Sequence, residues 1–319
     1  MGLQLPWRSA AGRARGAAAG KPRRTALVAL MGAAVLLVSG CSAETDYQLR
    51  NWGLPSGLNA DGETVGIATQ EAPHIADLWI WSWVAALATG VIVWGLMFWV
   101  IVKFRRRSAD EVPVQTRYNL PLEIFYTIAP VMMVIVFFFH TVQAQNAVLD
   151  DSEPDLTLEI VGQQWSWTFN YPTDGTGTTD EEERDELEYA YTVGAAGQIP
   201  TLVLPVDTTV RFNLHSPDVI HGFWIPGFLM KMDVVPGRLN HFQVTPTEIG
   251  TFRGKCTELC GTYHSRMLFN VEVVSQEDYA ATVAEIATTD NVSEQGPLLG
   301  GSDARTVQGQ HDENSGGDE

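Results

Sequence analysis

Cysteine is scarce in this chain, with only three in 319 residues. Cys41 stands alone near the N-terminus, and Cys256 and Cys260 lie four positions apart. So few thiols exclude a disulfide framework as the basis of the fold. Basic residues are also few, 20 against 38 acidic ones, and the formal net charge is −18. A chain this acidic repels nucleic acid and attracts basic partners.

Acidic residues are absent from residues 1–40, which are predicted to be a signal peptide. Basic residues precede an apolar run that extends over residues 25–38. This run is shorter than the roughly 20 residues that span a bilayer. It ends in Val38-Ser-Gly-Cys41, which resembles a bacterial lipobox, where the cysteine is acylated. We therefore expect a lipid anchor on Cys41; an uncleaved anchor and an ordinary cleavage site are the alternatives.

Residues 41–74 show no sustained periodicity and are predicted to form an exoplasmic linker with little structure of its own. Two long apolar runs follow, at 78–102 and 120–142. Both are long enough for a membrane-spanning helix, so we expect a transmembrane helical hairpin over residues 75–145. The basic cluster at 103–107 predicts that the connection is cytoplasmic and that the C-terminal domain is exoplasmic.

Apolar and polar residues alternate in the second half of the chain, as is typical of strands. The clearest alternating runs are 156–160, 209–214 and 267–274, with shorter ones near 189–193, 201–204 and 241–244. Short strands separated by Gly and Pro turns predict an all-β domain over residues 150–275, an antiparallel sandwich or barrel. Alternation alone does not choose between sandwich topologies.

Three further segments complete the organisation of the chain. Residues 173–190 are strongly acidic and are expected to be a solvated loop that buries nothing, serving either solubility or the docking of a basic partner. Residues 276–289 are predicted to be a short helix with Ser275 as its N-cap. Residues 290–319 are rich in Gly, Ser, Asp and Glu, and we expect a disordered acidic tail.

Soft metal donors are concentrated between residues 256 and 267. Within these twelve residues lie the thiols of Cys256 and Cys260, the imidazole of His264 and the thioether of Met267. Thiolate and thioether donors together with imidazole favour copper, whereas a closed structural zinc site does not use methionine. Two cysteines on one loop can each bridge a pair of copper ions. A disulfide or a zinc site is the alternative for the two cysteines.

A second imidazole is needed if each of two copper ions is to receive one. His221, which lies 35 positions before Cys256, is the best candidate. His215 and His241 match no ligand spacing and are assigned to structure. Glu258 lies between the two cysteines, so its backbone carbonyl can reach a copper ion while its side chain points away.

The cysteine motif resembles the dinuclear CuA centre of subunit II of haem-copper cytochrome c oxidases. This resemblance implies a cupredoxin-like Greek-key β-barrel anchored by a two-helix hairpin in a bacterial plasma membrane. It also implies that the side chain of Glu258 helps to bind a magnesium ion shared with subunit I. The acidic insertion resembles that of actinobacterial members, in which a haem c domain of a cytochrome bc complex donates the electrons.

Two more residues take their expected roles from the same family. The segment 162–171 resembles the family's aromatic motif, in which the first tryptophan, here Trp165, lies over the copper site and takes the electron from cytochrome c. The remaining aromatic residues of this segment are expected to fill the end of the barrel. Glu123 in the second helix resembles a glutamate at the mouth of a proton pathway into subunit I; snorkelling to water is the alternative.

Together these features imply that electrons enter an aerobic respiratory cytochrome c oxidase through this chain. They would pass to haem a of subunit I, where oxygen is reduced to water while protons are pumped. Subunits I and III and membrane lipid are the expected partners. The chain has no Cys-x-x-Cys-His motif, so the electron must arrive from another protein. A membrane-anchored copper carrier or assembly protein is the alternative function, and a quinol-oxidase subunit is not favoured because it lacks the metal ligands.

Overall fold

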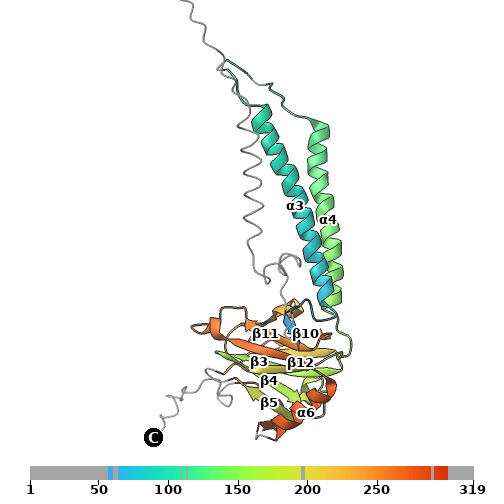
Figure 1. Cartoon of the computed structure of the whole chain (residues 1–319), viewed down its shortest axis with the longest axis vertical. Helices are drawn as coiled ribbons and strands as arrows, with labels where there is room; N and C mark the ends of the chain where they lie inside the picture. The colour runs from blue at the N-terminus through green and yellow to red at the C-terminus, as the bar shows by residue number, and fades with distance from the viewer. Residues whose placement is uncertain are drawn as a thin grey trace, which may run out of the picture. The chain divides into compact units, whose positions relative to one another are not determined.

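The computed structural model describes residues 57–59, 64–108, 110–112, 114–194, 198–288 and 291–300. The predicted signal peptide and the predicted lipidation site Cys41 lie outside the described residues. Within the described part, two long helices are followed by a β-domain and a short helix, α6 (Gln276–Ala287) (Figure 1). Ser275 caps this last helix by accepting the Asp278 N–H, as predicted.

Two apolar helices lie side by side, α3 (Ala72–Lys103) and α4 (Leu120–Val148) (Figure 1). Both are long and apolar enough to cross a membrane. Asn119 caps α4 by accepting the Leu122 N–H, while the Glu123 carboxylate accepts the Asn119 N–H at 2.9 Å. These reciprocal bonds satisfy N–H groups that the start of a helix leaves without partners. The hairpin extends a few residues beyond the predicted limits at each end.

The β-domain consists of two sheets that share one core. The first sheet contains β1 (Gly57–Asn59), β2 (Thr64–Val65), β6 (Thr201–Pro205), β8 (His221–Ile225), β9 (Met230–Val234), β11 (Gly250–Cys256) and β12 (Leu268–Val274). The second contains β3 (Leu156–Gln163), β4 (Ser166–Pro172), β5 (Tyr189–Val193), β7 (Val210–His215), β10 (Asn240–Val244) and β13 (Val292–Ser293). Their inner faces meet in a continuous cluster of buried apolar side chains.

Most neighbouring strands are antiparallel, as predicted, but β3 pairs with β7 and β6 pairs with β12 in parallel. The prediction of an antiparallel domain is wrong for these two pairs. A hairpin joins strands that are adjacent in sequence and makes them antiparallel, whereas parallel neighbours need a longer connection. Each parallel pair here joins strands that lie far apart along the chain.

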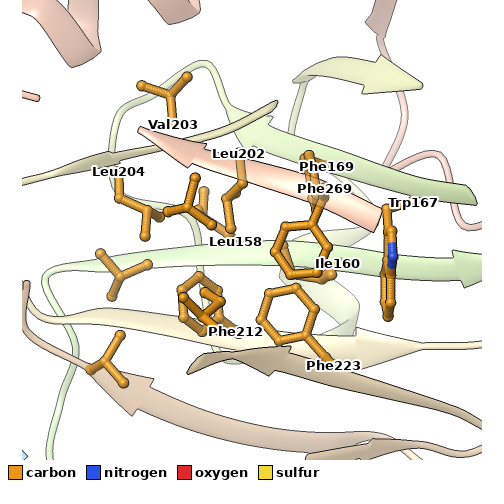
Figure 2. Packing of buried hydrophobic residues seen from close by; sticks show 14 of the residues in the cluster. Leu158, Ile160, Trp167, Phe169, Leu202, Val203, Leu204, Phe212, Phe223 and Phe269 are labelled. Carbon is orange, nitrogen blue, oxygen red and sulfur yellow. The ribbon is translucent and has the colours of Figure 1, made fainter. Parts of the chain in front are cut away.

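Aromatic side chains dominate the core (Figure 2). Phe223 and Phe269 stack with ring centroids 4.9 Å apart, and Trp167 packs edge-on against both, at 5.4 and 5.3 Å. Phe169 and Tyr171 are also fully buried, which confirms that the aromatic segment fills the interior. Figure 2 shows Trp167 at one end of this cluster. The same indole lies against His221, with ring centroids 6.3 Å apart, so the core directly supports a predicted ligand.

The linker predicted over residues 41–74 contains regular structure in its described part. Strand β1 pairs with both β2 and β11. Ala68 is fully buried in the core; its N–H donates to the Gly227 carbonyl, and its own carbonyl accepts the Thr247 N–H. The prediction of little structure is therefore wrong here, because the pairing strand lies far along the chain and leaves no local pattern in the linker.

The acidic insertion, residues 173–190, also departs from the expectation that it buries nothing. It contains one helical turn, α5 (Glu181–Arg184), and the Arg184 side chain is buried. The Thr176 carbonyl accepts the Thr157 N–H at 2.8 Å, which ties the insertion to the start of β3. Its acidic composition predicts solvation, and most of its carboxylates are exposed, but its backbone still finds partners on the sheet.

Part of the predicted disordered tail is ordered against the second sheet. Strand β13 pairs with β5. Asn170 on β4 accepts the Leu298 N–H at 2.8 Å and donates its own amide to the Leu298 carbonyl at 3.2 Å. Disorder was the wrong expectation for residues 291–300, because a buried side chain far back in the sequence satisfies their backbone. Residues beyond Gly300 lie outside the described part.

Candidate metal centre

Strand pairing brings the predicted ligands together at one end of the first sheet. Cys256 is the last residue of β11, and Met267 immediately precedes β12. His264 opens the short helix η2 (His264–Arg266) in the connecting loop. His221 is the first residue of β8, which pairs with β11 so that Cys256 lies opposite Phe223. Antiparallel pairing thus places a histidine beside a cysteine that is remote from it in sequence.

Each cysteine sulfur lies beside one imidazole nitrogen. The Sγ atoms of Cys256 and Cys260 are 3.8 Å apart, too far for a disulfide, in which the distance is about 2.05 Å. His221 Nδ1 lies 4.0 Å from Cys256 Sγ, and His264 Nδ1 lies 3.6 Å from Cys260 Sγ. Two sulfurs bound to one tetrahedral ion at about 2.3 Å each are about 3.8 Å apart. The observed separation therefore allows the two thiolates to share a metal ion.

A weak donor also lies beside each thiol. Met267 is fully buried, and its Sδ is 3.8 Å from Cys260 Sγ. The Glu258 carbonyl oxygen is 3.2 Å from Cys256 Sγ. The site thus repeats one pattern twice, with a sulfur, an imidazole and one weak donor in each half. This arrangement fits two soft metal ions better than a single ion.

A single tetrahedral zinc ion would need all four Cys and His donors to converge on one point. Only the ligand atoms of His221, Cys256 and Cys260 lie within 4.8 Å of one another among the described residues. His264 falls outside this compact group although its Nδ1 is close to Cys260 Sγ. The two imidazoles therefore serve different sulfurs, which argues against a mononuclear zinc site.

Asp218 orients the buried imidazole of His221. Its carboxylate accepts the His221 Nε2–H at 2.9 Å and the backbone N–H groups of Gln164 and Val219 at 2.7 and 2.6 Å. Burial raises the pKa of Asp218, but these hydrogen bonds outweigh burial and lower it. Burial lowers the pKa of His221, but Asp218 and Cys256 outweigh burial and raise it. The ring is thereby fixed with Nδ1 facing Cys256.

The two thiols have very different proton affinities without a metal. Burial raises the pKa of Cys256, but hydrogen bonds from His221 and the Gly222 N–H outweigh burial and lower it to about 6. Burial and the neighbouring charge of Cys256 raise the pKa of Cys260 to about 12. At neutral pH the metal-free pair therefore holds a thiolate at Cys256 and a protonated thiol at Cys260.

Copper uptake is expected to release at least one proton per chain, because a bridging cysteine must be a thiolate and Cys260 is protonated until far above neutral pH. The apparent affinity for copper should rise by about tenfold per pH unit between roughly pH 7 and 9 for one released proton. Calorimetric titration in buffers of different ionisation enthalpy measures the proton count. An affinity independent of pH in this range would contradict the assignment of Cys260 as a ligand.

Trp165 lies at the turn between β3 and β4, and its side chain packs against the ligand loop, residues 256–267. Its Nε1–H donates to the Cys260 carbonyl at 3.2 Å, and the Gln164 side chain donates to the same oxygen at 2.7 Å. The indole packs edge-on against Tyr263, with centroids 5.0 Å apart. Gly261 has φ +124°, and a Cβ there would lie 3.0 Å from Trp165 Nε1. Glycine at this position lets the indole approach the loop closely.

The other predicted residues lie in different surroundings. The His215 imidazole pairs with the buried Glu159 carboxylate, and His241 Nε2 lies 3.3 Å from Asp151, so both histidines bond within the fold. Glu123 belongs to α4, where its carboxylate caps the helix. Asp218 was not predicted from the sequence, although its place three residues before His221 is a usable signal.

Comparisons with known proteins address the family directly. A family model described as "Cytochrome C oxidase subunit II, periplasmic domain" matches residues 156–274. A probable cytochrome c oxidase subunit 2 of Streptomyces avermitilis is 49% identical over 245 residues, which cover 69% of this chain and 77% of that protein. The chain belongs to the cytochrome c oxidase subunit II family. The resemblance inferred from the cysteine motif is confirmed.

Subunit II proteins of other bacteria are also similar to this chain. Cytochrome c oxidase subunit 2 of Mycobacterium tuberculosis (strain ATCC 25618 / H37Rv) is 37% identical over 322 residues, covering 86% of this chain and 84% of that protein. A solved structure of the periplasmic domain of subunit II from Bradyrhizobium japonicum is 30% identical, has a TM-score of 0.36 and covers 42% of this chain and 95% of that chain. Two apolar helices followed by a subunit II periplasmic domain fit a two-pass membrane subunit of an oxidase.

Proposed function

We propose that this chain is the subunit through which electrons enter an aerobic respiratory cytochrome c oxidase, and that it does so by holding a dinuclear copper centre. The observation that carries the proposal is the doubled donor pattern, in which each of two sulfurs 3.8 Å apart has its own imidazole nitrogen within 4.0 Å. The proposed ligands are His221, Cys256, Glu258 through its carbonyl, Cys260, His264 and Met267.

When bound, two copper ions held by Cys256 and Cys260 would share one unpaired electron, so their bonds to the protein would change little on reduction. The protein would hold the donor atoms in fixed positions and exclude water from them. Cys256, Cys260, His221 and Met267 are all buried. The Trp167 ring packs against His221 on one side and against Phe223 in the core. Rigid packing of this kind leaves the ligands little room to rearrange.

The electron is proposed to arrive at Trp165. The indole is half-buried, so one part of it is open to a docked donor while its N–H contacts the carbonyl of a ligand residue. Tyr263, 47% exposed, lies beside it and extends the aromatic surface. A c-type cytochrome, or a haem c domain of a cytochrome bc complex, is the proposed donor, and haem a of subunit I is the proposed acceptor.

Further roles are proposed for residues at the boundary with other subunits. Glu258 is exposed, so its side chain is open to a magnesium ion whose remaining ligands would come from subunit I. Glu123 is proposed to lie at the mouth of a proton pathway into subunit I, although its carboxylate here caps α4. Subunit III is a further proposed partner. The β-domain is proposed to be exoplasmic, with Cys41 as a lipid anchor.

Rapid mixing of the copper-loaded oxidase with a reduced c-type cytochrome tests the proposal. We expect oxidation of the cytochrome to coincide with loss of the visible absorption of the oxidised copper centre, before haem a is reduced. The same preparation should keep its copper in the presence of a chelator. A chain that releases copper to the chelator and leaves the cytochrome reduced would instead be a copper carrier.

A further inference from the structure

A groove of about 920 Å³ runs between α3 and α4, distinct from the metal centre. The residues that line it form one stripe on each helix. His74 and Asp77 on α3, with His140 and Gln143 on α4, make a polar end. Beyond this end the walls are apolar, with Ala85 and Met132 farthest from the polar end along the two helices. A groove with one polar end and an apolar length suits an amphipathic molecule.

The apolar part of the groove spans most of one leaflet of a bilayer. Asp77 and Ala85 are 85 − 77 = 8 positions apart on α3, and His140 and Met132 are 140 − 132 = 8 positions apart on α4, which corresponds to about 12 Å along each helix axis. Half of a hydrocarbon core about 30 Å thick is about 15 Å. The polar end therefore lies at the membrane surface and the apolar end near the midplane.

The side chains along the groove suit an acyl chain. Ala85 is small and leaves space between the two helix backbones at the apolar end, as Ala144 and Ala147 do beside the polar groups. Met132 and Met133 are unbranched and flexible, so they can follow an irregular hydrocarbon surface. These walls would contact a flexible chain along its whole length without requiring a fixed shape.

The polar end combines an anion with two imidazoles. Asp77 is exposed, and no Lys or Arg of the described residues forms an ion pair with its carboxylate. His74 and His140 can donate to a phosphate, whereas a carboxylate alone would repel one. We propose that the groove binds one phospholipid of the outer leaflet whose headgroup carries both an ammonium and a phosphate, with the ammonium beside Asp77.

Blocking the apolar part of the groove tests this directly. The intact oxidase is purified with Ala85→Phe, which fills the groove, or with the matched control Ala86→Phe, which adds the same ring to an exposed position outside it. Native mass spectrometry counts the ethanolamine phospholipid retained per complex. We expect the first variant to retain one molecule fewer than the wild type and the control to retain the wild-type number.

Three outcomes would overturn the proposal. The first is an Ala85→Phe complex that retains as many phospholipids as the wild type. The second is a wild-type complex that carries an isoprenoid quinone in place of the phospholipid. The third is an Ala85→Phe complex that loses subunit I without losing lipid. The last result would mean that a helix of another subunit fills the groove. Copper content and lipid content are separate readouts, so failure here leaves the proposed function intact.

A second variant tests the proposed preference for the headgroup. Asp77→Asn keeps the size of the side chain and removes its charge. In nanodiscs of equal parts phosphatidylethanolamine and phosphatidylglycerol, the wild-type complex is expected to retain the ethanolamine lipid several-fold more often. The variant should show no preference. A preference that survives Asp77→Asn would contradict recognition of an ammonium group by this carboxylate.

Discussion

Replacing Cys260 with serine is expected to remove the proposed dinuclear copper centre while leaving the fold in place. Cys260 Sγ contacts the donors of Cys256, His264 and Met267, so its loss breaks contacts in both halves of the site. A hydroxyl oxygen is a hard donor that is protonated at neutral pH and does not replace a bridging thiolate. Turnover of the oxidase with cytochrome c should fall at least about a hundredfold, equivalent to about 2.7 kcal/mol of activation free energy.

The measurement is oxygen consumption together with copper content of the β-domain. Ser265→Ala is the control, because Ser265 is exposed on the same loop and is not a proposed ligand. The control should keep the copper and the activity. Circular dichroism checks that both variants are folded. A Cys260→Ser protein with two coppers and normal turnover would remove this cysteine from the ligand set.

Replacing Trp165 with phenylalanine is expected to slow electron arrival without removing copper. The substitution deletes the indole N–H that donates to the Cys260 carbonyl and shortens the ring that faces solvent. We expect the rate of reduction by a saturating c-type cytochrome to fall by about tenfold or more, equivalent to at least about 1.4 kcal/mol. Stopped-flow absorbance measures this rate, and copper content should stay at the wild-type value.

Trp224→Phe is the matched control for Trp165. Trp224 is also half-buried, and the Lys255 amino group lies over its ring, 4.7 Å from the centroid, but no described hydrogen bond joins its indole to a proposed ligand residue. The control should leave the rate of reduction unchanged. Equal effects of the two substitutions would mean that the loss reflects packing of the domain and not a pathway through Trp165.

The ligand loop could be predicted from the sequence because its donors lie close together in the chain. Four donor side chains between residues 256 and 267 define the chemistry before any fold is known. The helix after Ser275 was equally predictable, since an N-cap is a local signal. The burial of the aromatic segment followed from its composition. Local patterns therefore predicted which donors lie close together and much of the core.

Strand β11 was not predicted from the sequence, although it carries Cys256. Its residues alternate strictly between buried and exposed, but Gly250 and Gly254 occupy two of the buried positions. Glycine adds no apolar side chain, so the alternation is hidden. A Cβ at Gly254 would lie 2.0 Å from the Phe269 ring, which explains why the inward position holds no larger residue. The packing that requires glycine is invisible until both strands are in place.

Contacts between distant segments account for the remaining differences between the predicted and the observed structure. Strand β1 finds its partner in β11, and β13 finds its partner in β5. Asp218 gained its role only when the fold placed the Gln164 N–H and the His221 ring beside one carboxylate. None of these pairings has a signature within a short window of sequence. Composition predicted a linker with little structure around β1 and a disordered tail around β13, but said nothing about their backbone partners.

Electron paramagnetic resonance of the oxidised full-length chain, with copper quantified in the same sample, tests the central claim most directly. Two copper ions bridged by Cys256 and Cys260 predict two coppers per chain and hyperfine splitting by two equivalent nuclei, because one unpaired electron is shared. One copper per chain with splitting by a single nucleus would contradict the account. A colourless protein with a disulfide between the two cysteines would contradict it equally.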